Sequence, residues 1–183
     1  MNAMASSARR PARRRGVTLV ELLAAVAVLI VLAAVTVPAA RFAVNRARAA
    51  TCLGNLRAIG VAIEAWLGEH NGRMPDLAAG RRSKDEEVPV LETALNRYLD
   101  SPGVFHCPAD HAEFARSGSS YLWNSTQSGR HKLQLSFFGI EGEPQAVPLV
   151  TDKEAWHPGR DGVNVLYADY RVSDRIEFRA ARR

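Results

Sequence analysis

The sequence predicts an α+β protein in which one long N-terminal helix packs on a small antiparallel β-sheet. An apolar run over 17–37 continues past Pro38 into a helical stripe, and the C-terminal half contains short apolar segments separated by turn residues. A single long helix has to bury its stripe against another element, and short strands with short connections favour an antiparallel sheet.

The N-terminal apolar run has the length of a membrane-spanning helix. Over 17–37 only Thr18, Glu21 and Thr36 carry polar side chains, and the run is about 31 Å long as a helix, against about 30 Å for a bilayer core. Five arginines and no acid precede it. This predicts a single-pass membrane protein with a cytoplasmic N-terminus and an extracytoplasmic C-terminal domain. Glu21 is costly in such a segment and therefore marks a functional site.

The residues around Glu21 form a motif, Arg15-Gly16-Val17-Thr18-Leu19-Val20-Glu21-Leu22-Leu23. It resembles the cleavage and methylation signature of type IV prepilins and type II secretion pseudopilins. The resemblance implies cleavage after Gly16 and N-methylation of Val17, which stands where phenylalanine is usual. It also implies roles in assembly for Glu21, the fifth residue of the processed chain, and for Pro38, the twenty-second.

The same resemblance implies a structural subunit of a type II secretion or type IV pilus filament with a pilin-like fold. Its partners would be a prepilin peptidase and methylase, other pilin-like subunits in a helical filament, an inner-membrane assembly platform and membrane lipid. The implied parts are a cleaved leader 1–16, a transmembrane and filament-core helix 17–40, an amphipathic continuation 41–72 and an extracytoplasmic domain 73–183. The sequence does not separate a secretion pseudopilin from a pilus subunit, or a major from a minor subunit.

Two other interpretations of the N-terminal segment stay open. A secretory signal peptide has an apolar core of about 7 to 15 residues, and Val37-Pro38-Ala39 imitates its cleavage site. The longer run and Glu21 count against it. A plain, unprocessed membrane anchor leaves both Gly16 and Glu21 unexplained.

Beyond Pro38 the helix is predicted to continue to about Asn71, with a bend near Pro38 because proline removes one backbone hydrogen bond. We expect the helix to end there because the glycine of Asn71-Gly72 suits a left-handed helix cap and Pro75 prevents the helix from continuing. The stripe recurs at spacings of three and four and consists of Ala49, Leu53, Leu56, Gly60, Ile63 and Leu67.

The rest of the chain is predicted to form an exposed loop over 75–87, a short helix over 88–99 and a series of strands. These strands are 103–106, 120–123, 133–138, 146–150, 163–168 and 171–178. Two stretches here extend the resemblance to pilin-like proteins, Cys107-Pro108-Ala109-Asp110 and 164–172. In the second, Tyr170-Arg171 replaces glycine and histidine, and Tyr170 disfavours a turn that needs a positive φ.

The net charge of the chain belongs to the predicted leader. The formal charge is +5, and the leader contains five arginines and no acid, so 24 − 5 = 19 bases face 19 acids after cleavage. A neutral processed chain argues against nucleic acid as a partner. A minor pilin that binds DNA or a surface ligand stays as the alternative. A membrane-anchored enzyme is a weaker one, because no G-x-S-x-G or H-E-x-x-H motif or glycine-rich phosphate loop is present.

The only two cysteines, Cys52 and Cys107, both lie in the part predicted to be outside the cytoplasm. An oxidising compartment favours one disulfide between them, and two separately buried thiols are the alternative. Zinc is disfavoured: His106 and His111 flank Cys107, but no paired ligand spacing exists, and Cys52 would have to leave the disulfide.

No cofactor and no firm metal site are predicted. Calcium is a weak candidate because it binds several oxygen ligands, which Asp152, Asp161 and Asp169 could supply. No EF-hand spacing is present, so we favour the interpretation that these three aspartates are turn residues without a metal.

Overall fold

A computed structural model describes residues 16–157 and 161–176. Only Gly16 of the predicted leader lies within the described residues. Residues 177 and 178 of the predicted strand 171–178 lie outside them. Contacts divide the chain into two compact units, 1–41 and 42–183; the predicted bounds of the four parts stay predictions.

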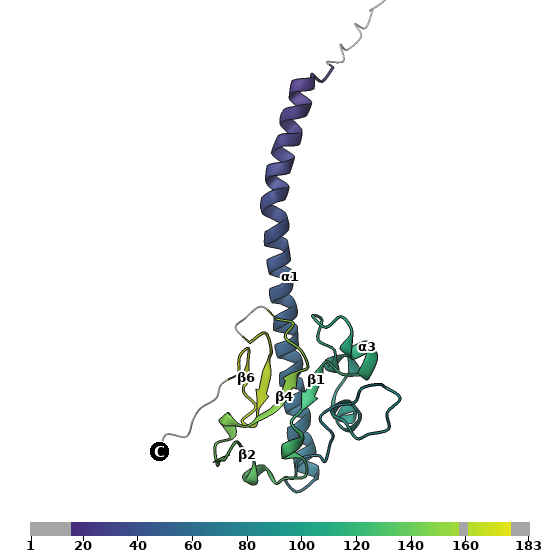
Figure 1. Ribbon diagram of the computed structural model, residues 1–183, viewed down its shortest axis with the longest axis vertical. Helices are drawn as coiled ribbons and strands as arrows, with labels where there is room; N and C mark the ends of the chain where they lie inside the picture. The colour runs from purple at the N-terminus through teal and green to yellow at the C-terminus, as the bar shows by residue number, and fades with distance from the viewer. Residues whose placement is uncertain (1–15, 158–160, 177–183) are drawn as a thin grey trace, which may run out of the picture. The chain divides into compact units, whose positions relative to one another are not determined.

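Helix α1 (Leu19–Glu69) is the longest element and belongs to both units (Figure 1). It is the only helix among the described residues that is long and apolar enough to cross a membrane. Its buried residues are Cys52, Leu56, Ile59, Gly60, Ala62, Ile63 and Leu67. Four of the six predicted stripe residues are therefore buried, and Ala49 and Leu53 are half-buried.

The C-terminal end of α1 lies where it was predicted. Asn71 and Gly72 have φ values of 53° and 71°, and the Gly72 amide donates to the Leu67 carbonyl at 2.9 Å. Two residues with left-handed backbone conformation at a helix end let the amides that follow bind carbonyls of the last turn, which otherwise have no hydrogen-bond partner.

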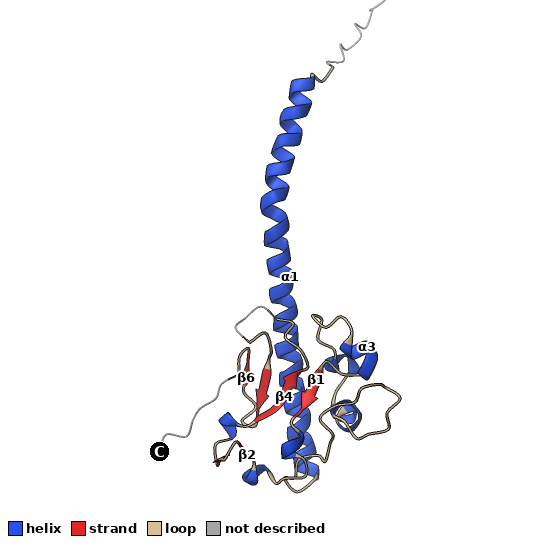
Figure 2. Cartoon of the chain, in the orientation of Figure 1, coloured by secondary structure: helices blue, strands red, loops and turns tan. Residues whose placement is uncertain are grey.

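Four short strands form the main sheet, in the order β1-β4-β5-β6 with every pair antiparallel (Figure 2). They are β1 (Tyr121–Trp123), β4 (Pro148–Asp152), β5 (Val165–Tyr167) and β6 (Val172–Ser173). A separate hairpin pairs β2 (Ser136–Phe137) with β3 (Ile140–Glu141). Together with α1, this confirms the predicted α+β class.

The sheet and the C-terminal part of α1 share one hydrophobic core. Leu56, Ile59 and Ile63 of the helix belong to the same buried cluster as Trp123 of β1 and Leu166 of β5. The other half of the prediction, that the helix buries its stripe on the sheet, is therefore confirmed within residues 42–176.

The helical segments between α1 and the sheet are shorter than predicted. The expected helix over 88–99 is α2 (Leu91–Ala94) followed by the 3₁₀-helix η1 (Asn96–Tyr98). The strand predicted over 103–106 is wrong: the chain forms η2 (Pro102–Phe105) there. Pro102 presets the helical φ and the Ser101 hydroxyl accepts the Gly103 amide at 3.1 Å, which caps a helical turn.

The remaining segments were predicted with mixed success. The predicted strand 133–138 is divided between η4 (Lys132–Gln134) and β2, and the one over 146–150 between η5 (Pro144–Ala146) and β4. Helix α3 (Glu113–Ser117) and η3 (Ser125–Gln127) were not predicted. The loop over 75–87 is not wholly exposed, because Leu77 is buried and Ala79 accepts the Trp123 amide at 2.8 Å beside β1.

The turn between β5 and β6 forms although Tyr170 disfavours it locally. Tyr170 has a φ of 64°, a strain of about 1–3 kcal/mol for a residue other than glycine. Its hydroxyl is hydrogen-bonded to Glu64 of α1, and a Cβ on Gly60 would lie 3.5 Å from its ring and 3.2 Å from Leu166. Gly60 thus lets the hairpin approach α1, and these contacts offset the strain.

Candidate functional site

The predicted processing and assembly residues lie at the start of α1, where Thr18 and Glu21 bind each other reciprocally. The Glu21 carboxylate accepts the Thr18 amide at 2.8 Å and the Thr18 hydroxyl at 2.9 Å. The Thr18 hydroxyl accepts the Glu21 amide at 3.2 Å. This is a capping box, which satisfies two amides at the helix N-terminus, where the dipole also favours a negative charge.

The capping box stands at the head of an apolar surface. All side chains described over 16–47 are exposed, including Leu22, Leu29 and Val35 at 56%, 64% and 71%. Nothing described in residues 16–41 covers them, so this surface is available to lipid or to other helices. Val17, which would be the new N-terminal residue, is 77% exposed and lies next to the box.

Pro38 lies inside α1, and the helix continues on both sides of it. Because proline has no amide hydrogen, one backbone hydrogen bond of the helix is missing there. The bend at this residue and its part in assembly stay predictions.

Residues 11–37 match the family model of the prokaryotic N-terminal methylation motif, which is the type IV prepilin signature. The match covers Gly16, Val17 and Glu21 but none of the unit over 42–183. No curated protein and no solved structure matches the chain. The motif, the apolar helix and the α+β pilin-like fold support a precursor of the type IV pilin or pseudopilin kind. They indicate a membrane-anchored structural subunit rather than an enzyme.

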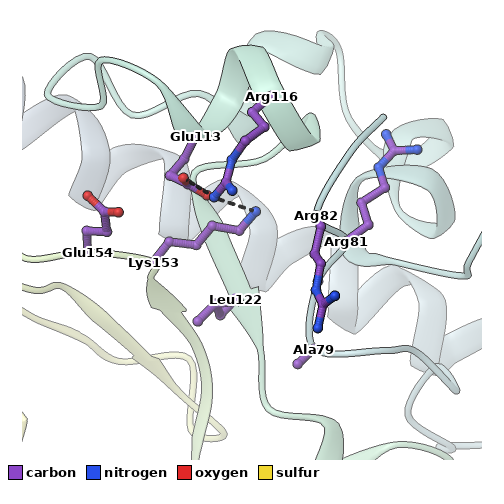
Figure 3. A pocket seen from close by; sticks show the side chains of 9 residues that line it. Ala79, Arg81, Arg82, Glu113, Arg116, Leu122, Lys153 and Glu154 are labelled. Atoms are coloured by element: carbon purple, nitrogen blue, oxygen red, sulfur yellow. Dashed lines mark hydrogen bonds and ion pairs between the residues drawn. The ribbon is translucent and has the colours of Figure 1, made fainter. Parts of the chain in front are cut away.

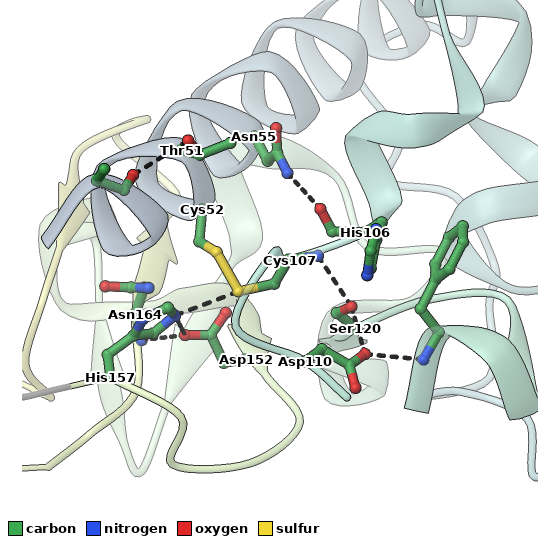
Figure 4. Close-up of a disulfide and its surroundings, with 12 residues drawn as sticks. Thr51, Cys52, Asn55, His106, Cys107, Asp110, Ser120, Asp152, His157 and Asn164 are labelled. Carbon is green, nitrogen blue, oxygen red and sulfur yellow. Dashed lines mark hydrogen bonds and ion pairs between the residues drawn. A yellow bond between two sulfur atoms is a disulfide. The ribbon is translucent and has the colours of Figure 1, made fainter. Parts of the chain in front are cut away.

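The predicted disulfide joins α1 to the segment that follows η2 (Figure 4). Cys52 and Cys107 are bonded, their Cα atoms are 5.0 Å apart, and neither residue is exposed to solvent. The alternative of two separate thiols is therefore excluded. The bond ties the helix to the chain that leads into the sheet.

Asp110, the last residue of the Cys-Pro-x-Asp element, organises the chain around this disulfide. Its carboxylate accepts the amides of Ala112, Glu113 and Phe114 at 2.7–2.8 Å, and so caps α3. It also accepts the Ser120 hydroxyl at 2.6 Å, and that hydroxyl accepts the Cys107 amide at 2.9 Å. One carboxylate thus connects a helix start, the chain before β1 and the disulfide.

These contacts make Asp110 a pH-dependent stabiliser. Burial alone would raise the pKa of Asp110, but the Ser120 hydroxyl and the three amides outweigh it and hold the pKa below its ordinary value. A carboxylate with a lowered folded-state pKa stabilises the fold above its unfolded-state pKa, about 3.9. That stability is lost as the pH falls through the folded-state pKa.

We expect Asp110→Ala to lower the free energy of unfolding by about 3 kcal/mol, since hydrogen bonds to a charged group contribute about 1.5–3 kcal/mol each and partly compensate one another. Denaturant unfolding at pH 7, followed by tryptophan fluorescence, measures it. Asp100→Asn, at an exposed residue, is the matched control and should change little. Equal stability of Asp110→Ala and wild type would contradict this role.

His157 packs against the disulfide from the other side, and sequence reasoning did not connect the two. Its Nε2 atom lies 3.4 Å from Cys107 Sγ and 3.3 Å from Asp152 Oδ2. Both side chains are buried, with 4% and 0% of their surfaces exposed. Because both contacts use Nε2, the arrangement is not a catalytic triad, in which the acid and the nucleophile occupy different ring nitrogens.

The three aspartates considered for calcium do not converge on one site. Asp152 ends β4 and Asp169 follows β5, at opposite ends of the β4–β5 pair, whose register joins Thr151 to Val165 and Pro148 to Tyr167. Asp152 accepts the Asn164 amide at 2.6 Å, Asp161 accepts the Ile176 amide at 3.1 Å, and Asp169 accepts the Arg171 amide at 3.1 Å.

A basic pocket of about 370 Å³ lies between α3 and the loop that covers β1 (Figure 3). Its charged lining consists of Arg81, Arg82, Arg116, Lys153, Glu113 and Glu154. Lys153 is almost fully buried, donates to the Ser117 hydroxyl at 2.6 Å and lies 4.0 Å from Glu113. Burial lowers the pKa of Lys153, against the opposing effect of Glu113. These residues are far apart in sequence, so no pattern signalled the pocket.

Proposed function

We propose that the chain is a structural subunit of a type II secretion or type IV pilus filament, and that cleavage after Gly16 prepares it for assembly. The observation that carries the proposal is the Thr18–Glu21 capping box within the methylation motif. In the unassembled subunit the box satisfies Glu21 within its own helix. Cleavage creates a positive amine on Val17, so that a partner for the same carboxylate becomes available on a neighbouring subunit.

The energetic logic of assembly follows from burial. In a bundle of apolar helices Glu21 leaves water, and an unpaired buried charge is strongly unfavourable. Pairing with the Val17 amine of a neighbour compensates it, and loss of one partner of a buried pair costs about 3–5 kcal/mol. Only one axial register satisfies each carboxylate, so Glu21 selects the register while the apolar surface supplies contact area.

The proposal is tested by isolating surface filaments from cells that express the chain with its assembly machinery. We expect the processed chain in sheared, sedimentable filaments that electron microscopy resolves as thin helical fibres. Cells without the assembly ATPase should retain the chain in the inner membrane. Exclusive recovery as dispersed membrane protein in the complete system would overturn the proposal.

A second candidate is a minor subunit that binds an anionic ligand such as DNA, and the basic pocket favours it. Arg82 is exposed, and its guanidinium has no hydrogen-bond or ion-pair partner among the residues that the structure describes. We expect Arg82→Glu to weaken DNA binding, measured by fluorescence anisotropy, and to reduce the salt slope by about one. Lys132→Glu, a charge change outside this pocket, is the control. Equal affinity of both variants and the wild type for DNA would exclude this pocket as the DNA-binding site.

A further inference from the structure

We infer that the buried cluster around the disulfide is a zinc site in the reduced chain, with Cys52, Cys107, His157 and Asp152 as ligands. The ligand atoms of the two cysteines and of His157 all lie within 4.8 Å of one another. Asp152 is not part of this cluster and is added as the fourth ligand because of its contact with His157. Two thiolates, one imidazole and one carboxylate form a tetrahedral donor set that suits Zn²⁺. This inference does not depend on filament assembly, because the cluster lies within residues 42–176.

The distances from His157 match the edges of a zinc tetrahedron. Zinc binds sulfur at about 2.3 Å and nitrogen or oxygen at about 2.0–2.1 Å, so sulfur and nitrogen ligands lie about 3.5 Å apart, and nitrogen and oxygen ligands about 3.3 Å. Nε2 of His157 is 3.4 Å from Cys107 Sγ and 3.3 Å from Asp152 Oδ2 (Figure 4). The distance to Asp152 is slightly longer than an ordinary nitrogen–oxygen hydrogen bond, and 3.4 Å is an ordinary hydrogen-bond distance to the larger sulfur atom. The two distances are therefore compatible with ligands around a shared ion as well as with hydrogen bonds.

Both proposed ligands from outside the disulfide have a second polar atom that is buried. His157 Nδ1 and Asp152 Oδ1 have no hydrogen-bond partner among the residues that the structure describes, while Asp152 Oδ2 accepts the Asn164 amide at 2.6 Å. Buried polar atoms without partners are uncommon. Because Nδ1 and Oδ1 are not the atoms at the zinc-edge distances, the ligand assignment rests on Nε2 and Oδ2.

The surroundings allow access and balance the charge. His157 lines two surface hollows of about 350 and 220 Å³, which connect the cluster to solvent. Arg46 lines the first hollow and Arg48 the second. A Zn²⁺ ion with two thiolates, a neutral imidazole and a carboxylate carries one net negative charge, which these arginines would complement.

The site forms only after reduction. A dithiol reductant transfers two electrons and two protons to the disulfide, giving two thiols and the oxidised reductant. Zinc binding then releases both thiol protons, and the sulfurs separate to about 3.8 Å, the sulfur–sulfur edge of a tetrahedral site. In a newly exported chain that is not yet oxidised, such an ion would hold Cys52 and Cys107 side by side.

The test uses the full chain in detergent micelles, reduced anaerobically with a phosphine and titrated with Co²⁺ and then Zn²⁺. We expect one Co²⁺ per chain, with the visible absorption of a tetrahedral thiolate site, and its displacement by Zn²⁺. His157→Ala should weaken Co²⁺ binding at least about 10-fold, and His111→Ala, which removes a nearby exposed histidine, should not. The oxidised wild-type chain should bind no Co²⁺ at this site.

Two further measurements keep the result interpretable. The oxidised His157→Ala chain should retain the disulfide and a cooperative unfolding transition, which shows that the variant folds. Absence of stoichiometric Co²⁺ binding by the reduced wild type would overturn the inference, whether or not the reduced chain is folded, because zinc sites couple binding to folding. Equal affinity of the wild type and a folded His157→Ala chain would also overturn it.

Discussion

Replacing Glu21 with alanine is expected to abolish filament assembly while membrane insertion stays intact. The variant removes the only acid from the apolar segment over 17–37, so insertion becomes more favourable. In the proposed filament it would also leave the Val17 amine of each neighbour without its partner inside an apolar bundle, at a cost of about 3–5 kcal/mol per subunit. Because every subunit of the proposed filament would incur this cost, we expect assembly to fail.

Two matched variants separate the charge of Glu21 from its capping role. Glu21→Gln preserves the geometry of the capping box with Thr18 but has no charge, so we expect it to be inserted, helical and unassembled. Thr18→Ala removes the side chain that binds Glu21 but keeps the charge, so we expect it to assemble. The measurements are carbonate extraction of membranes for insertion and the yield of sheared filaments for assembly. Normal filaments from Glu21→Gln would show that the charge has no role.

Removing the disulfide is expected to have the largest effect on the stability of the domain. The bond closes a loop with a sequence separation of 55, and the chain-entropy model gives about 4 kcal/mol for that length. Both sulfurs are fully buried, so the variant Cys52→Ala/Cys107→Ala also loses packing. Guanidinium unfolding of the oxidised wild type and of the double variant, followed through the buried Trp123, measures the difference. A loss below about 1 kcal/mol would contradict the account.

The reduced wild-type chain is the natural control for the double variant. It keeps both sulfur atoms and their packing but lacks the crosslink, so the difference between reduced chain and double variant isolates the packing contribution. The comparison requires a chelator, because the inferred zinc site would stabilise the reduced chain by mass action.

Features that depend on local sequence were predicted well. The apolar periodicity located the buried face of α1, and Asn71-Gly72 located its end, because both are consequences of neighbouring residues. The position of β1 also followed from its apolar and aromatic run. The strand predicted over 103–106 was wrong because a segment of four residues is too short to show the periodicity that distinguishes a strand from a helix. The Ser101 cap and Pro102 favour a helical turn there.

Features that depend on tertiary contacts were not predictable. Tyr170 disfavours a left-handed turn locally, and only its contacts with Gly60 and Glu64, about 110 residues away, make the turn acceptable. Likewise, His157 follows Cys107 by 50 residues, and no ligand spacing connects the two. The sequence directed attention to His106 and His111 beside Cys107, whereas the ring that contacts the sulfur comes from the segment after β4.

Intact-mass spectrometry of the protein purified from membranes shows whether the chain is a prepilin-type precursor. We expect a chain that has lost Met1 to Gly16, begins at Val17 and carries one added methyl group on its N-terminal amine. A Gly16→Leu variant should keep the full precursor mass. A wild-type chain that retains its leader in cells with an active prepilin peptidase, or one cleaved after Ala39, would contradict this expectation.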